Sequence, residues 1–524
     1  MSLRSQLSAL APTDAWRLAR IAVIAGFVLL IGRYWNPYYG FTALLQADPV
    51  TESLLPATLR DTPVFIHRDA GRYDGAYYAQ IATSPTLRDP ALAGAVDDLG
   101  YRARRILLSG VAWVAGGGDP VRIVHAYAWL NVLLWFGFAA LLWRVFPAAD
   151  GGRALLGWAA LLLASGTLAS VRLALTDLAA VTLLATGIHL AERGRSGAAT
   201  ALLGLGGLAR ETALLGLGAL LPPEKKDLRG FVRRGALLLL AVLPLAGWWW
   251  YLRSAAGSSS AGTANFAWPL AGWLGRAREL VQLTPREANH WLVAGAWLDV
   301  GALAVQMVYL LARPQWRDPW WRLGALFAVF GLCLGPAVLE GLPGAAARVL
   351  LPLTLAFNVL AVRRRAALLW LVLGNLSVLG GVWSLWAPPG EPHNLSAHTT
   401  WSQSTLLETD ARWKVAEWNS KWRWAWCNGV GGVNFRIWPW VPRARVELQV
   451  RGITPRALEV WQNQTRVWRG QIGDQPQWIR LPELPVERGN LRLELRSEAP
   501  ATGEGEANTA RDISFACFGA RLVD

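Results

Sequence analysis

Long apolar runs separated by short, Arg-rich connections dominate the first 386 residues of the chain. An α-helix needs about 20 apolar residues to cross roughly 30 Å of hydrocarbon. The runs that reach or approach this length are 16–33, 121–143, 154–171, 174–191, 231–251, 291–312, 321–340, 345–362 and 366–386. The pattern therefore predicts a polytopic α-helical membrane domain over residues 1–388, with about nine to eleven membrane helices.

One further apolar stretch, 197–221, differs from the others. Glycines at 204, 206 and 207 and the triplet Arg210-Glu211-Thr212 interrupt it, and basic residues flank both ends. Basic loops favour the cytoplasmic side, so a single crossing would place one of them on the wrong face. A broken hairpin keeps both on one side, and irregular backbone is tolerated at membrane depth where it lines a cavity. We favour the hairpin and keep the single span as the alternative.

The same rule orients the rest of the membrane domain. We place the basic residues around 193–195, 225–234 and 363–365 on the cytoplasmic side, which makes residues 34–120 one long outer loop. Within this loop, segment 105–118 is too short to span, and we expect it to form a helix along the membrane interface. The chain after residue 386 is then also outside.

Past residue 388 the pattern changes from long runs to period-two alternation. Alternating stretches include ARVELQVRG, RALEVWQNQTRVWRG, QWIRLPEL, NLRLELRSE and DISFACFGARL. Such stretches, bounded by Pro, Gly and Asn, are typical of antiparallel strands. We therefore expect residues 389–524 to form a separate outer β-sandwich of jelly-roll type.

Two features of this C-terminal part leave alternatives open. Cys427 and Cys517 could form a disulfide outside the cytoplasm, or they could remain two buried thiols. The Trp-rich segment 418–429 fits an interfacial anchor, which we favour, or a platform on which sugars stack.

Composition supports a membrane protein and excludes an ordinary soluble one. Of the 524 residues, 53% are hydrophobic and only 17% are charged. The net charge of +15 comes mainly from Arg in short loops, which fits topology and phosphate binding better than a nucleic-acid surface. Arg4, Arg17 and Arg20 mark the start of the first run, and no small-residue cleavage site follows it. We expect an uncleaved anchor.

The outer loop contains the segment RYDGAYYAQIA, 72–82. As a helix, this segment places Asp74, Tyr77, Tyr78 and Ile81 on one face, so that a carboxylate lies beside phenols and an apolar anchor. A lone carboxylate in a membrane-edge cavity suits a general base acting on a sugar hydroxyl.

Metal binding is disfavoured in this segment. A helix turns Asp69 and Asp74 to different sides, and no nearby side chain completes a set of ligands. We expect His67 to lie at the surface or behind the site, and we expect neither a metal nor a cofactor.

Arginines from distant parts of the chain could join Asp74. They are Arg102, Arg104 and Arg105 in YRARR, Arg172 in SVRLALTD with Asp177 at its end, Arg210 beside Glu211 in LARET, and Arg348 in AARVLLPL. Converging guanidinium groups indicate an anionic ligand, and we expect a phosphate or diphosphate. The plainer interpretations are a headgroup contact for YRARR, a mutually neutralised Arg210–Glu211 pair, and span-end charges for Arg172 and Arg348.

These segments, together with RVLLPLTLAFN, resemble the bacterial membrane glycosyltransferases of the GT-C superfamily and, more distantly, the GPI mannosyltransferases and protein O-mannosyltransferases. The resemblance covers residues 16–386, and the sandwich is similar to domains appended in some bacterial members. It implies an inverting transfer of a sugar from a polyprenyl-phosphate carrier to a glycan, lipid or protein acceptor on the periplasmic side of the bacterial inner membrane.

By this resemblance, Asp74 takes the catalytic position. Many members carry a second acidic residue where this chain has Tyr73, which makes metal dependence less expected. The resemblance and the arginine pattern together assign substrate binding to Tyr73, Tyr77, Tyr78, Arg102, Arg105, Arg172, Asp177, Arg210, Glu211 and Arg348.

Two other functions remain as alternatives. A non-enzymatic carrier or flippase for lipid-linked sugars could use the same arginines, but the chain lacks the internal repeat typical of such proteins. A membrane-anchored glycopolymer-assembly protein could bind polymer through its sandwich, although an anchor hardly needs intramembrane Arg and Glu.

Overall fold

The structure, a computed structural model, describes the chain in segments and forms two compact units. The described residues are 12–36, 39–54, 64–68, 70–147, 151–221, 228–257, 262–341, 344–390, 392, 399–402, 405–419, 422–437, 442–487, 490–499, 501–504 and 511–523. One unit contains residues 1–34, 41–64 and 69–389, and the other contains 35–40, 65–68 and 390–524. Arg4, Asp69 and the basic residues 225 and 226 lie outside the described residues.

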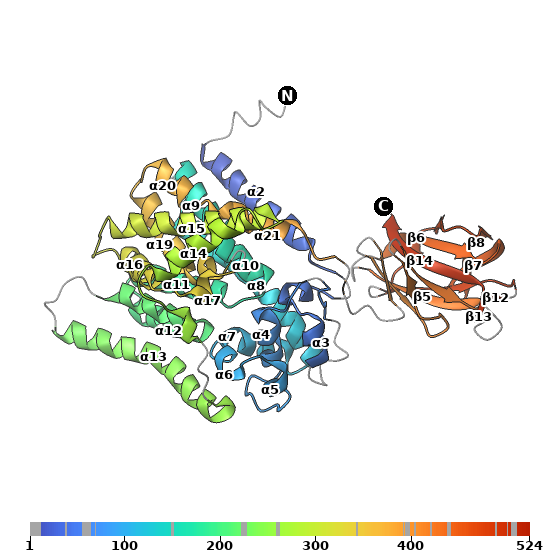
Figure 1. Ribbon diagram of the computed structural model, residues 1–524, viewed down its shortest axis with the longest axis horizontal. Helices are drawn as coiled ribbons and strands as arrows, with labels where there is room; N and C mark the ends of the chain where they lie inside the picture. The colour runs from blue at the N-terminus through green and yellow to red at the C-terminus, as the bar shows by residue number, and fades with distance from the viewer. Residues whose placement is uncertain are drawn as a thin grey trace. The chain divides into compact units, whose positions relative to one another are not determined.

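Six helical stretches in the described part of the first unit are long and apolar enough to cross a membrane (Figure 1). They are α2 (Pro12–Gly32), α8 (Pro120–Val145), α9 with α10 (Gly151–Leu163 and Ser165–Arg172), α13 (Leu228–Ala256), α15 (His290–Leu311), and α20 with α21 (Leu368–Leu373 and Ser377–Trp386). Each coincides with a predicted run, so the prediction of many apolar helices of spanning length is confirmed for these six.

The other three predicted runs form shorter helices. They are α11 (Asp177–Glu192), α16 (Pro319–Leu332), and α18 with α19 (Ala346–Val349 and Leu351–Arg363). The run predicted at 321–340 stops early because Gly335 is extended before Pro336, and proline disfavours a helical residue before it. The expected nine to eleven spans therefore exceed the six full-length helices found in the described segments.

Residues 196–220 form a hairpin, as predicted. Helix α12 (Ser196–Ala209) ends at Arg210, whose backbone is extended, and the 3₁₀ helix η4 (Glu211–Leu220) runs back along it. A Cβ on Gly206 would lie 3.4 Å from the Cβ of Ala213, and one on Gly216 would lie 3.4 Å from a methyl of Leu203. This antiparallel pairing returns the chain to the end from which α12 starts.

Short helices of the first loop gather at one end of this unit (Figure 1). They are η1 (Thr42–Leu45), α3 (Pro49–Leu54), α4 (Asp74–Thr83), α5 (Leu92–Ala95), α6 (Leu99–Arg102) and α7 (Leu107–Gly116). In α7, Leu108 and Ala112 are buried while Val111 and Val114 are exposed. The helix predicted there is confirmed, and its exposed apolar face suits the membrane interface we predicted.

The first unit has two chemically distinct ends, defined by the termini of α11. This helix begins at Asp177 and ends about 24 Å away at Glu192, from a rise of about 1.5 Å per residue. Glu192 pairs with Arg363 at 2.6 Å and accepts a hydrogen bond from the Trp320 indole. The arginines at 193–195 and 363–365 therefore lie together at the end opposite Asp177.

The second unit consists mainly of two antiparallel sheets. The first has the order β1 (Thr399–Ser402), β2 (Thr405–Thr409), β5 (Val430–Arg436), β11 (Asn490–Arg496), β7 (Arg456–Gln462), β8 (Thr465–Ile472). The second has β10 (Leu484–Pro485), β6 (Arg443–Gly452), β14 (Phe515–Val523), β4 (Arg423–Cys427), β3 (Glu417–Trp418), with β9 (Gln477–Arg480) beside β6. Strands β12 (Thr502–Glu504) and β13 (Arg511–Ile513) pair antiparallel with each other.

Alternation of side chains builds the core of this unit. Leu491, Leu493 and Leu495 of β11 are buried in the same apolar cluster as Val446 and Leu448 of β6. The intervening residues of β11 face away from that core, as expected for a pleated strand. The predicted antiparallel two-sheet domain is confirmed.

The two cysteines of the second unit are free buried thiols. Cys517 lies opposite Ala425 in the strand register, and Cys427 lies opposite Phe515. Burial raises the pKa of each thiol to about 12, which makes both chemically inert at neutral pH.

In the Trp-rich segment, Trp426 belongs to the core, and Trp422 and Trp424 pack against it partly buried. Trp426 is 1% exposed and packs with Ile513, Ala516 and Phe518, and the Trp424 ring stacks on Phe518. The anchor interpretation is therefore wrong for Trp426, because a buried indole cannot reach a membrane surface.

The hairpin makes a labelling prediction. Arg195 and Leu221 are both exposed and mark its two ends. In a Cys333→Ser background, Arg195→Cys and Leu221→Cys should both resist an impermeant maleimide added outside sealed cells, and both should react after permeabilisation. Gln471→Cys, in the second unit, should react from outside. Labelling of position 195 but not 221 from outside would contradict the hairpin.

Candidate functional site

The start of helix α4 contacts the ends of η1 and α10, because its second residue, Gly75, has no side chain. A Cβ on Gly75 would lie 2.3 Å from the carbonyl oxygen of Leu173 and 3.1 Å from that of Leu45. No larger residue fits there without moving backbone. The amide of Tyr73 also donates to the carbonyl of Gln46 at 3.1 Å. These contacts hold Asp74 at the end of the unit where α10 ends and α11 begins.

Asp74 is held by one arginine. Its carboxylate pairs with Arg102 at 2.8 Å and retains 21% side-chain exposure. Arg102 also pairs with Asp97 at 2.7 Å, and its guanidinium lies 5.1 Å from the centre of the Tyr77 ring. Burial raises the pKa of Asp97, but hydrogen bonds and charge from Arg102 outweigh this and hold that pKa below its usual range. Asp74 and Tyr77 thus both contact the guanidinium of Arg102, which agrees with the prediction that they lie on one face of the helix.

Arg105 forms a second, buried part of the site. Its guanidinium donates to the hydroxyl oxygen of Tyr78 at 2.9 Å and pairs with Glu211 at 3.2 Å. A longer contact of 3.4 Å reaches the hydroxyl of Tyr101. Arg105 therefore links helix α4 to the turn of the hairpin, and Glu211 neutralises it.

Asp177 forms ion pairs with Arg210 and Arg348. Its side chain is 2% exposed, and it pairs with Arg210 through one oxygen and with Arg348, at 3.5 Å, through the other. Arg348 also donates to the hydroxyl of Tyr73 at 2.6 Å. A Cβ on Gly166 would lie 2.2 Å from the carbonyl oxygen of Ala347, so this glycine lets α10 touch the short helix that carries Arg348.

The predicted convergence of Arg105, Arg210 and Arg348 is present, but its cause differs from our expectation. We expected a shared anionic ligand to explain it. The structure supplies Asp177 and Glu211 as counter-charges from the chain itself. The alternative pairing of Arg210 with Glu211 is also replaced, because each pairs with a more distant residue in the sequence.

Two arginines at this end have no carboxylate partner among the described residues. Arg172 contacts the amide oxygen of Gln46 at 3.4 Å and lies 5.2 Å from the centre of the Tyr34 ring. Arg72 is exposed, and its guanidinium lies 5.8 Å from the centre of the Tyr77 ring. Gln46 lies between these two arginines: its amide oxygen contacts Arg172, and its amide nitrogen donates to the carbonyl of Gly71, the residue before Arg72. These cations remain available to an anion.

Sequence reasoning missed several members of the site. No sequence pattern pointed to Asp97, because a loop brings it to Arg102. Tyr101 could have been predicted, because it stands four residues before Arg105. The expectation that His67 lies at the surface is wrong, because it is 6% exposed and packs against Phe65 in the second unit. Within the described segments, no three His, Cys, Asp or Glu side chains lie together as a metal site would require.

Comparisons with family models, curated proteins and solved structures returned no match to this chain. The class that the fold defines is a protein with several apolar helices of membrane-spanning length and a two-sheet β domain. Its distinctive feature is a network of arginines, carboxylates and tyrosines at one end of the helical unit.

The network makes a stability prediction. Asp177→Asn leaves two buried guanidiniums without their counter-charge, so it should lower the free energy of unfolding in detergent by about 3 to 5 kcal/mol. Asp97→Asn, where the carboxylate is 38% exposed, should cost less than about 1 kcal/mol. Adding Arg348→Met to Asp177→Asn should recover part of the loss. Equal effects of the two single substitutions would contradict a central role for Asp177.

Proposed function

We propose that the helical unit is an inverting glycosyltransferase that moves a sugar from a polyprenyl-phosphate carrier to an acceptor on the outer side of the bacterial inner membrane. The observation that carries this proposal is the arrangement around Asp74. A partly exposed carboxylate lies beside a cluster of arginines and tyrosines, at one end of a unit with membrane-length helices. That end lies opposite the arginine-rich end, which the positive-inside rule assigns to the cytoplasm.

Asp74 is the general base in this proposal. Arg102 holds the carboxylate and is itself fixed by Asp97, so the orientation of Asp74 is set before the acceptor arrives. As the acceptor hydroxyl attacks the anomeric carbon, Asp74 takes its proton. The bond between that carbon and the phosphate oxygen breaks, and the polyprenyl phosphate leaves with the electron pair. One displacement of this kind inverts the anomeric configuration.

The arginines stabilise the phosphate as it leaves. Arg172 and Arg72 offer cations that form no direct ion pair with a described carboxylate, although charge from Arg72 helps to lower the pKa of Asp48 and Asp97. Arg210 and Arg348 are oriented by Asp177, and Arg348 reaches the hydroxyl of Tyr73, the residue next to the base. Donors fixed in advance and shielded from water stabilise developing charge more than mobile surface groups do. In this proposal Arg105, Arg210 and Arg348 are held in place to donate hydrogen bonds to the phosphate, and Arg172 and Arg72 supply further positive charge.

Asp74→Asn tests the proposal directly. It retains shape but cannot accept a proton, so sugar transfer in proteoliposomes should fall by about 10² or more while donor binding persists. Glu192→Gln is the matched control, because it removes a carboxylate paired with an arginine, Arg363, at the opposite end of the unit, and it should retain most activity. The assay uses a panel of polyprenyl-phosphate sugars.

Two results would contradict this function. Transfer by Asp74→Asn within a few-fold of the unaltered protein would remove this residue from the chemistry. Movement of the donor across the membrane without cleavage of its sugar, by the unaltered protein, would favour the carrier alternative.

A further inference from the structure

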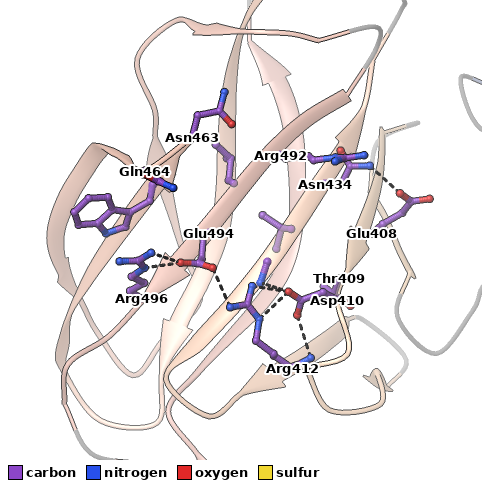
Figure 2. Close-up of a pocket in the computed structure, with 14 residues that line it drawn as sticks. Glu408, Thr409, Asp410, Arg412, Asn434, Asn463, Gln464, Arg492, Glu494 and Arg496 are labelled. Atoms are coloured by element: carbon purple, nitrogen blue, oxygen red, sulfur yellow. Dashed lines mark hydrogen bonds and ion pairs between the residues drawn. The ribbon is translucent and has the colours of Figure 1, made fainter.

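A polar groove lies on the face of the first sheet of the second unit that points away from the core (Figure 2). Its volume is about 650 Å³, and strands β2, β5, β11 and β7 contribute its lining. The outward-facing residues of β11, Arg492, Glu494 and Arg496, cross its centre. A second hollow of about 580 Å³ shares Asn463 and Arg492 with it. The two together form a continuous polar surface across the sheet.

A glycine makes the groove possible. Gly432 of β5 lies opposite Glu494 of β11 in the strand register. A Cβ on Gly432 would lie 2.4 Å from a carboxylate oxygen of Asp410 and 3.1 Å from the guanidinium of Arg412. With glycine there, the backbone amide donates to Asp410 at 2.9 Å, and both charged side chains lie over the strand. Any larger residue would fill this part of the floor.

Most charges in the floor are already paired. Asp410 pairs with Arg412 at 2.6 Å, Arg412 with Glu494 at 2.9 Å, and Glu494 with Arg496 at 2.5 Å, as Figure 2 shows. Hydrogen bonds from Arg412 hold the pKa of Glu494 below its usual range. This row of ion pairs is a preformed polar surface, because each side chain holds its neighbour in place.

Two side chains in the groove keep unused hydrogen-bonding capacity. Arg492 is exposed and has no hydrogen bond or ion pair within the described part of the chain. Gln464 is also exposed, and its side-chain amide has no hydrogen bond among the described residues. An exposed guanidinium and an exposed amide therefore line the same hollow, which is open to solvent.

The chemistry of the lining selects the ligand. The volume lies within the roughly 300 to 1,000 Å³ typical of small-ligand sites, but the lining is polar, which argues against lipid tails and apolar helices. An extended peptide would seek main-chain partners at an open strand edge, whereas this groove lies on a sheet face. A sugar chain presents many hydroxyl groups, each both donor and acceptor, and so matches adjacent amide, carboxylate and guanidinium groups.

We propose that this groove binds an oligosaccharide segment, with Arg492 and Gln464 making direct hydrogen bonds to its hydroxyl groups. The inference does not depend on the transfer reaction, since it concerns a separate unit and different residues.

The test uses the full chain in detergent and an array of short neutral and uronic-acid oligosaccharides. At least one oligosaccharide should bind, and Arg492→Ala and Gln464→Ala should each weaken its binding about tenfold, the effect of losing roughly one hydrogen bond to a charged or polar group. Arg480→Ala, on β9 of the other sheet, is the matched control and should bind normally. A thermal melt of each variant confirms that it is folded.

Three outcomes would overturn the proposal. They are no binding of any oligosaccharide, binding that neither groove substitution affects, and displacement of the sugar by hexaglutamate as effectively as by free oligosaccharide, which would indicate charge attraction alone. Sugar transfer by the helical unit is measured on the same variants. If a groove variant loses oligosaccharide binding but keeps donor binding and sugar transfer, the groove and the transferase site are independent, so either proposal can fail without the other.

Discussion

The buried carboxylate of Asp177 is the constraint on which the arrangement of the helical unit depends. It stands at the first turn of α11 and bonds to arginines from the hairpin and from the helix pair α18–α19. Burying charges is costly unless they are paired, so neither arginine could occupy its position without this partner. Through Arg348 the same carboxylate reaches Tyr73, and through Tyr73 it reaches the start of α4 and Asp74. A single acidic residue thus connects segments separated by hundreds of positions in sequence.

Glycines determine how closely these segments approach. Gly75 and Gly166 each face a carbonyl oxygen at a distance that leaves no space for a Cβ, and each lies beside a charged member of the network. Gly432 plays the corresponding part in the β domain, where it admits Asp410 and Arg412 over a strand. In both units, a glycine without a side chain lets neighbouring groups approach its backbone, and charged residues lie beside each of these close contacts.

Features with a local signature could be predicted from the sequence. The apolar runs predicted the long helices, the glycines with Arg210-Glu211 predicted the hairpin, and i, i+3, i+4 spacing predicted the shared face of Asp74 and Tyr77. Partnerships over long sequence separations could not be predicted, which is why Asp177 was named without its two arginines. The strand VGGVNFR was missed because two glycines lower its apparent strand propensity, and the groove was missed with it.

The central claim is that this network receives a sugar phosphate, and donor affinity measures it most directly. Arg105→Lys, Arg210→Lys and Arg348→Lys keep the charge but lose the planar guanidinium. For folded protein in detergent, the account predicts that at least two of these variants bind a polyprenyl-phosphate sugar more weakly by about 1.5 to 3 kcal/mol. Arg363→Lys, paired with Glu192 at the opposite end, should bind it normally. Unchanged donor affinity in all three variants would contradict the account and leave these arginines with a role in helix packing alone.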